Sequence, residues 1–114
     1  MSDWHLYMLR CNDNSLYTGI TTDVERRVDQ HSRGDGARYL RGRAPLTLVF
    51  TSFVLDHSDA LRMERRVKSL PKQHKERLAS GDLGLFTTLF EAMRQRQKSK
   101  EKPHDLPDEP TDES

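Results

Sequence analysis

The fold is decided by residues 4–20, which read WHLYMLRCNDNSLYTGI. Residues 4–10 and 16–20 are rich in β-prone apolar and aromatic side chains, and the Asn-Asp-Asn cluster between them is typical of a turn. This pattern predicts a β-hairpin at the start of the chain.

The register of the hairpin determines which side chains share a face. With the loop centred on Asp13, Tyr7 lies opposite Gly19 and Leu9 lies opposite Tyr17. Both tyrosines then project from one face on a diagonal. A register shift of one residue would separate them.

Helical periodicity and turn residues predict the remaining elements. Thr22 and Glu25 match a capping box, so a helix is expected from Thr22 to about Arg33, before Gly34 and Gly36. A strand apolar on both faces, and hence central in the sheet, is expected over residues 45–54, with further helices over about 56–70, 71–78 and 83–97. Together these elements predict an α/β fold with a small mixed three-stranded sheet flanked by helices.

Length and charge divide the chain. Its 114 residues suit one domain, expected over residues 1–82, with the amphipathic helix 83–97 packed on it. Residues 98–114 hold three lysines and six acids, so the net charge of +1 conceals a +4 body and a −3 tail. The composition predicts that this acidic tail is disordered.

A single cysteine, Cys11, and the lack of a long apolar run predict a cytoplasmic protein without disulfide or membrane span.

Two polar residues are expected on the inward face of the first helix. Val24 and Val28 define its apolar stripe, and Arg27 and His31 fall within about 60° of Val24 whereas Arg26 points away. Because a partly buried arginine is costly without an anion, Arg27 has three possible roles: a phosphate ligand, a member of an internal ion pair, or a snorkelling side chain.

Glu64 presents the same question on the second long helix. It lies four residues after Ala60 and three before Val67, beside the apolar stripe. Either it is the structural counterion of Arg27 or it is a metal ligand, since Mg²⁺ is often held by one or two carboxylates together with water and substrate phosphate.

Aromatic residues occur at both the hairpin and a later loop. Tyr7 and Tyr17 are either ordinary strand tyrosines with the hydroxyl at the rim or functional phenols. The loop before the third strand combines cations with an aromatic ring, which suits phosphates and stacked bases as well as it suits a solvated loop. Its residues are Arg38, Tyr39, Arg41 and Arg43.

Taken together, these residues resemble the GIY-YIG nuclease superfamily, and closely resemble its stand-alone bacterial members of the YhbQ type. The resemblance covers about residues 4–80. Its first motif corresponds to His5-Leu6-Tyr7 and its second to Tyr17-Thr18-Gly19, so only the two tyrosines and the glycine keep the letters that name the family. An arginine eight residues after the glycine, a histidine four residues further on and a helical glutamate complete the pattern; they are Arg27, His31 and Glu64.

The resemblance implies metal-dependent hydrolysis of nucleic-acid phosphodiesters, with DNA the favoured substrate. Glu64 would hold Mg²⁺ or Mn²⁺, and Arg27 would neutralise charge growing on the phosphate. One tyrosine would activate water, with Tyr17 preferred to Tyr7, and His31 would orient a phosphate or relay a proton. Two other functions are compatible with the sequence: a nucleic-acid-binding module with little or no catalysis, and a protein-interaction domain.

Overall fold

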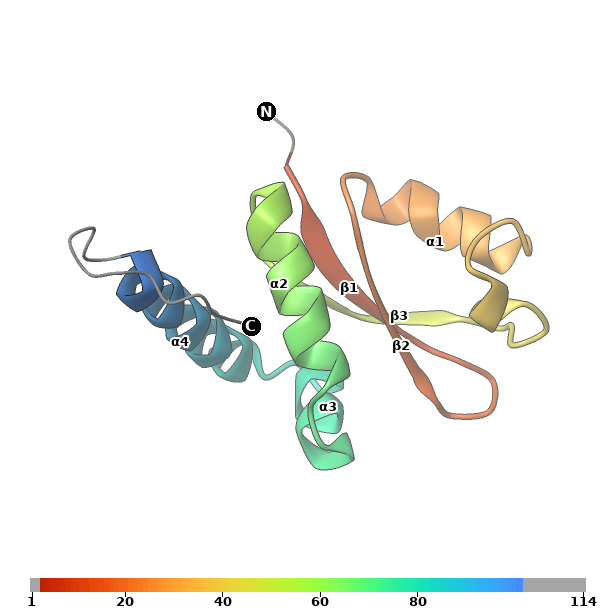
Figure 1. Cartoon of the computed structure of the whole chain (residues 1–114). Coiled ribbons are helices and arrows are strands. Elements are labelled where there is room, and N and C mark those ends of the chain that lie inside the picture. Colours follow the sequence, from red (N-terminus) through yellow and green to blue (C-terminus); the bar gives the residue numbers. More distant parts are fainter. Residues whose placement is uncertain (1–2, 102–114) are drawn as a thin grey trace.

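The protein folds as a three-stranded sheet with helices on both faces (Figure 1). A computed structural model describes residues 3–101, with side-chain surroundings given through residue 97. The elements in chain order are β1 (His5–Arg10), β2 (Leu16–Thr21), α1 (Val24–Ser32), the 3₁₀ helix η1 (Arg38–Leu40), β3 (Thr47–Thr51), α2 (His57–Lys68), α3 (Lys72–Ala79) and α4 (Leu83–Glu101). The predicted α/β class is confirmed.

The sheet has the strand order β2-β1-β3 and is antiparallel throughout. The predicted hairpin register is confirmed, with Tyr7 paired to Gly19 and Leu9 paired to Tyr17. Two details of the predicted sheet were wrong. The sheet is not mixed, because β3 runs antiparallel to β1, and the central strand is β1 rather than the segment 45–54.

The apolar character of segment 45–54 does not reflect a central position in the sheet, because much of the segment stays at the surface. Leu48, Phe53 and Val54 are 41%, 37% and 54% exposed, whereas Phe50 is buried. β3 ends at Thr51, three residues before the predicted end, so Phe53 and Val54 lie beyond the strand, and Leu48 is exposed within it because β3 is an edge strand. A register shift between Met8 and Leu9 adds an irregularity to the pairing of β1 with β3.

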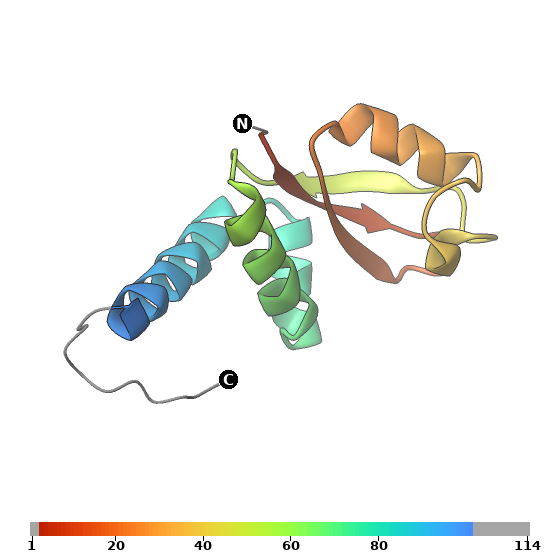
Figure 2. The same ribbon diagram turned by 45° about the horizontal axis from the view of Figure 1, so that its top comes forward.

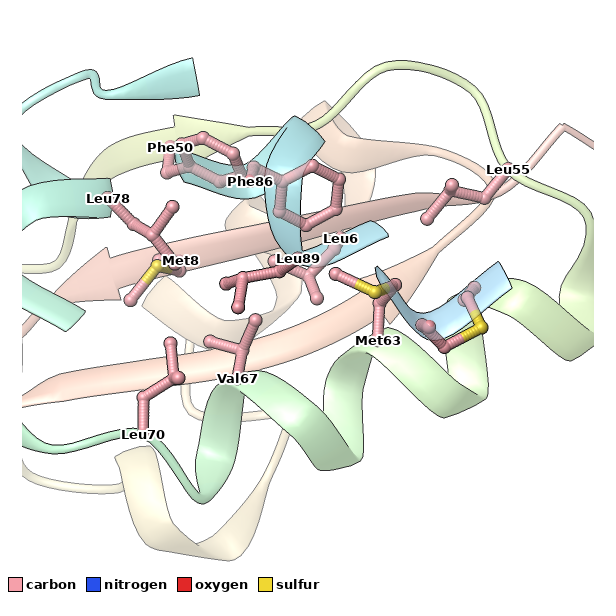
Figure 3. Packing of buried hydrophobic residues seen from close by; sticks show 12 residues of the cluster. Leu6, Met8, Phe50, Leu55, Met63, Val67, Leu70, Leu78, Phe86 and Leu89 are labelled. Atoms are coloured by element: carbon pink, nitrogen blue, oxygen red, sulfur yellow. The ribbon is translucent and has the colours of Figure 1, made fainter. Parts of the chain in front are cut away.

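Alternate side chains of β1 enter two separate hydrophobic clusters. Leu6 and Met8 pack in the larger cluster, against buried residues of α2, α3 and α4 (Figure 3). Tyr7 and Leu9 enter the smaller cluster, beside residues of α1 and η1. Accordingly α1 lies on one side of the sheet, and α2, α3 and α4 lie on the other (Figure 2).

Side-chain caps set the starts of α1 and α2. The N-cap of α1 is Asp23, whose carboxylate accepts a hydrogen bond from the backbone N–H of Arg26 at 3.1 Å. The predicted cap at Thr22 was therefore one residue too early, and the helix itself begins at Val24. The reason is that β2 continues to Thr21, whose hydroxyl accepts from the N–H of Asp23. For α2 the cap is Asp56, whose carboxylate accepts from the backbone N–H of Asp59 at 2.8 Å.

The C-terminal helices complete the larger cluster. Phe86, Leu89 and Met93 of α4 are buried in it, and the backbone of α4 continues to Glu101, four residues past its expected end. The rest of the segment predicted to be disordered, residues 102–114, lies outside the described residues. Within residues 3–101 no helix is long and apolar enough to cross a membrane.

Candidate active site

A buried hydrogen bond joins β1 to α1 at the centre of the smaller cluster. The Tyr7 hydroxyl lies 2.8 Å from Nε2 of His31, and the two residues are only 1% and 2% exposed. The pairing follows from the sequence, since the strand turns Tyr7 towards α1 and the helical spacing from Val24 and Val28 places His31 on the inward face.

A second contact of the imidazole fixes which nitrogen carries its proton. The backbone N–H of Ala37 donates to Nδ1 of His31 at 3.1 Å. An imidazole nitrogen that accepts a hydrogen bond has no proton, so in neutral His31 the proton is on Nε2. His31 therefore donates to the Tyr7 oxygen, and the hydroxyl proton of Tyr7 is directed elsewhere.

Two glycines leave the space that these rings occupy. A Cβ at Gly19 would come within 2.6 Å of the Tyr7 hydroxyl oxygen and within 2.8 Å of Cζ. A Cβ at Gly36 would come within 1.9 Å of Nδ1 of His31. Both positions need the absence of a side chain rather than an unusual backbone angle. The motif glycine, Gly19, is thus required by the tyrosine on the neighbouring strand.

Tyr17 extends the cluster from the interior to the surface. Its ring centroid is 5.4 Å from that of His31 and 6.3 Å from that of Tyr7. On its other side Tyr17 stacks on the exposed Tyr39 at 6.0 Å, and the guanidinium of Arg43 lies 4.2 Å from the Tyr39 centroid. Tyr17 is half-buried, so it is the more accessible of the two motif tyrosines.

Burial and a nearby cation set the protonation of the inner pair. Burial, reinforced by repulsion from Tyr17, raises the pKa of Tyr7 well above its ordinary value, although the Arg27 guanidinium opposes this. Burial and then the positive charge of Arg27 lower the pKa of His31 below its ordinary value of 6.5. At neutral pH both side chains are therefore uncharged.

Arg27 is the cation of this cluster. It is half-buried whereas Arg26 is exposed, so the predicted orientation of the two arginines is confirmed. Arg27 donates to the side-chain oxygen of Gln30 at 3.1 Å, a neutral partner. It also lines an open hollow of about 310 Å³ beside the end of β2, with Trp4 and Thr21 on its wall.

Glu64 lies on α2, on the other side of the sheet from α1. Its side chain is 23% exposed and forms an ion pair with Lys68 at 3.2 Å. In the described part of the chain no hydrogen bond or ion pair joins Glu64 to Arg27, so the alternative of a structural Arg27–Glu64 pair does not hold.

The donor set available for a metal is small. Residues 3–97 contain no group of three or more His, Cys, Asp or Glu side chains placed to hold a metal ion. Glu64 fits only the mode in which one carboxylate binds Mg²⁺ and water and phosphate fill the other positions, and its partial exposure leaves room for them.

The basic-aromatic loop is divided between the cluster and solvent. Tyr39 and Arg43 adjoin the cluster, and Arg43 also pairs with Asp13 and donates to the backbone oxygen of Tyr39. Arg38 and Arg41 are exposed at the two ends of η1. Only these last two arginines are fully open to a ligand.

Comparison with known proteins shows the family of the chain. The sequence model of the GIY-YIG catalytic domain matches residues 3–77, which is most of the chain. The chain belongs to the GIY-YIG family. The predicted resemblance is therefore confirmed. The matched span contains Tyr7, Tyr17, Arg27, His31 and Glu64 and ends within α3, so α4 lies outside it.

Individual GIY-YIG relatives are single-domain proteins of similar length. The UPF0213 protein of Cronobacter sakazakii is 54% identical over 94 residues, covering 82% of this chain and 94% of that protein. The UPF0213 protein YhbQ of Escherichia coli K12 is also 54% identical over 94 residues, covering 82% and 93%. The solution structure of the UPF0213 protein BH0048 from Bacillus halodurans is 43% identical, with a TM-score of 0.45, and covers 76% of this chain and 96% of that one.

Two parts of the candidate site in this GIY-YIG chain could not be predicted from the sequence analysis. Gly36 and the backbone N–H of Ala37 hold the imidazole of His31, but Gly36 was interpreted only as a helix terminator. In the sequence, the only indication that Gly36 lies against the imidazole is its position five residues after His31. The tautomer of His31 had no signal in the sequence, because it depends on a backbone contact made by the loop.

Proposed function

We propose that this GIY-YIG chain is a divalent-metal-dependent endonuclease that hydrolyses nucleic-acid phosphodiesters, with DNA the favoured substrate. The observation that carries the proposal is the cluster of Tyr7, His31 and Tyr17 beside the guanidinium of Arg27. It combines an accessible phenol, an oriented imidazole and a cation in one place, and these groups can activate water, transfer a proton and stabilise phosphate charge in phosphodiester hydrolysis.

Arg27 would neutralise the charge that grows on the phosphate. Its hydrogen-bond partner is neutral, and no ion pair of Arg27 occurs among residues 3–97. A half-buried guanidinium without a counterion is stabilised by an anion. The hollow of about 310 Å³ that Arg27 lines gives a phosphate access from solvent.

The two tyrosines would have different tasks. Tyr17 is the better choice to activate water, because it is the more accessible and reaches the surface. Tyr7 is buried, its raised pKa keeps it protonated, and its oxygen already accepts from Nε2 of His31. Tyr7 and His31 would therefore position Tyr17 and a phosphate oxygen.

Glu64 would hold Mg²⁺ or Mn²⁺ through its partly exposed carboxylate. The ion supplies Lewis-acid stabilisation of a phosphate or leaving oxygen. For this role Glu64 would exchange its lysine partner for the cation, which the i, i+4 surface pair with Lys68 resists only weakly.

The test is a Glu64→Gln variant assayed on a panel of DNA and RNA structures with and without Mg²⁺ and Mn²⁺. Loss of a surface pair with Lys68 should cost only about 0.5 kcal/mol, so the fold is kept. Metal-dependent cleavage should be lost while binding persists. Glu91→Gln removes the same charge from an exposed site on α4 and should leave cleavage unchanged. An active Glu64→Gln variant would refute the metal-ligand role.

The small donor set favours one alternative, a nucleic-acid-binding module with little or no catalysis. In that case the same panel would give salt-sensitive binding in every buffer and no cleavage by the unmodified chain with either metal. Cleavage by the unmodified chain, absent after addition of EDTA, would exclude this alternative.

A further inference from the structure

A polar groove lies between α2 and α4, on the side of the sheet away from α1. The two helices are joined by Asp59, whose side chain is 7% exposed and pairs with Arg62 at 3.3 Å and Arg94 at 2.8 Å. One buried carboxylate thus holds a guanidinium from each helix at the groove.

The groove contains two hollows that share Arg62 and Gln97. The first, of about 490 Å³, lies between the start of α2 and residues 94–97 of α4, and its lining includes the carboxylates Asp56 and Asp59 as well as Arg62, Arg94 and Gln97. The second, of about 350 Å³, lies further along α2 and also includes Arg62 and Gln97. The shared residues make the two hollows one continuous surface along both helices.

The second hollow carries cations that have no counterion among the side chains described by the structure, residues 3–97. It is lined by Arg65 and Arg66 of α2 and by Arg96 of α4, and no ion pair involves these three residues in the described part of the chain. Guanidinium groups converging from two helices repel one another, and an anion between them removes that repulsion. Their planar, forked donors suit phosphate oxygens.

The other lining residues indicate the class of anion. Ser69 and Gln97 are neutral hydrogen-bonding side chains, and Met93 adds an apolar floor. Polar residues of this kind, mixed with arginine, are the usual contacts to phosphate and sugar in nucleic-acid complexes. The first hollow is lined by Asp56 and Asp59, and its two arginines pair with Asp59, so the phosphate contacts are expected in the second hollow.

The groove is separate from the tyrosine cluster. Arg62 and Arg66 lie on one flank of the buried stripe of α2, and Glu64 lies on the other flank. The tyrosine cluster is on the opposite face of the sheet. One of the two walls is α4, which is outside the span that matches the GIY-YIG domain.

We propose that the α2–α4 groove is a second binding surface for the sugar-phosphate backbone of nucleic acid, engaged through Arg65, Arg66 and Arg96. The assignment of the ligand class rests on the proposed function, but binding at the groove requires no cleavage. A substrate held here and at Arg27 is contacted at two separate places on its backbone.

The test compares two charge-matched variants that bind a fluorescein-labelled DNA duplex in EDTA, where cleavage is blocked. Arg66→Ala/Arg96→Ala removes one exposed cation from each wall, and Lys72→Ala/Lys75→Ala removes two cations from α3. Each lost phosphate contact reduces the slope of log affinity against log salt by about 0.9, so the groove variant should lose about 1.8. When the salt is raised from 50 mM to 200 mM, the factor by which the affinity of the groove variant falls should then be about 12 times smaller than the factor for the unmodified chain.

The α3 variant should keep the original slope, and Arg66→Lys/Arg96→Lys, which retains both charges, should restore most of it. Circular dichroism melting of each variant checks the fold. A groove variant that melts normally and keeps the slope of the unmodified chain would overturn the proposal, even if the chain cleaves DNA. A reduced slope in a chain that cleaves nothing would support the groove and refute the nuclease.

Discussion

Replacing Gly19 by alanine should remove the close fit between β2 and the Tyr7 ring. The new Cβ would come within 2.6 Å of the hydroxyl oxygen, 2.8 Å of Cζ and 3.0 Å of Cε1, and the fully buried ring has no free space to enter. Overpacking of a core costs about 1–3 kcal/mol. Displacing the hydroxyl from His31 should cost about a further 1 kcal/mol.

The expected loss of about 3 kcal/mol is large enough to measure in two ways. In a domain of this size it corresponds to a melting temperature lower by about 12 °C, and urea unfolding followed by fluorescence of the single tryptophan gives the free energy directly. Gly84→Ala, in the first turn of α4, is the matched control, since its Cβ would meet only Oδ1 of the preceding Asp82, at 3.5 Å. This control should be neutral or slightly stabilising.

A Tyr7→Phe background tests the cause. Phenylalanine removes the closest atom and the hydrogen bond to His31, so Gly19→Ala should cost about 1 kcal/mol less there than in the unmodified chain. Equal costs in the two backgrounds, or a Gly19→Ala variant as stable as Gly84→Ala, would refute the argument from ring contact.

Two further predictions concern the imidazole and the loop. The pKa of His31 is lowered in the folded chain, so its contribution to the stability of the fold is complete above pH 6.5 and should be lost as the pH decreases below 6.5. Melting temperatures measured across pH should show that a His31→Phe variant lacks this part of the decrease in stability. Changing Arg38 and Arg41 to alanine should reduce the salt slope of duplex binding by up to about 1.8, whereas Arg43→Ala should change it less because Asp13 already pairs with Arg43. If the Arg38→Ala/Arg41→Ala variant has the same salt slope as the unmodified chain, η1 is not part of the binding surface.

The parts of the fold predicted correctly from sequence depend on local rules. The register of Tyr7 with Gly19 follows from the alternation of a strand and the position of one turn. The difference between Arg26 and Arg27 follows from helical periodicity alone. Both predictions need only neighbouring residues, and both are confirmed.

The errors concern relations between distant segments. Whether segment 45–54 pairs at the centre or the edge of the sheet depends on which strand it meets. The sequence alone does not distinguish an apolar residue that remains exposed, such as Leu48, from a buried one. The hydrogen bond from Ala37 to His31 depends on the path of a loop, and the groove of Arg66 and Arg96 depends on how α4 packs against α2. No periodicity in the sequence encodes these relations.

The central position of β1 has a consequence for how the molecule opens. This strand is hydrogen-bonded along both edges, and its residues from Leu6 to Leu9 are at most 1% exposed. Its amide protons should therefore exchange with solvent only when the whole domain unfolds, whereas η1 and the outer edge of β3 can open locally. Tyr7 is fixed to the most protected strand, and Arg38 and Tyr39 lie on one of the least protected segments. The loop can thus adjust to the shape of a ligand without moving the inner phenol.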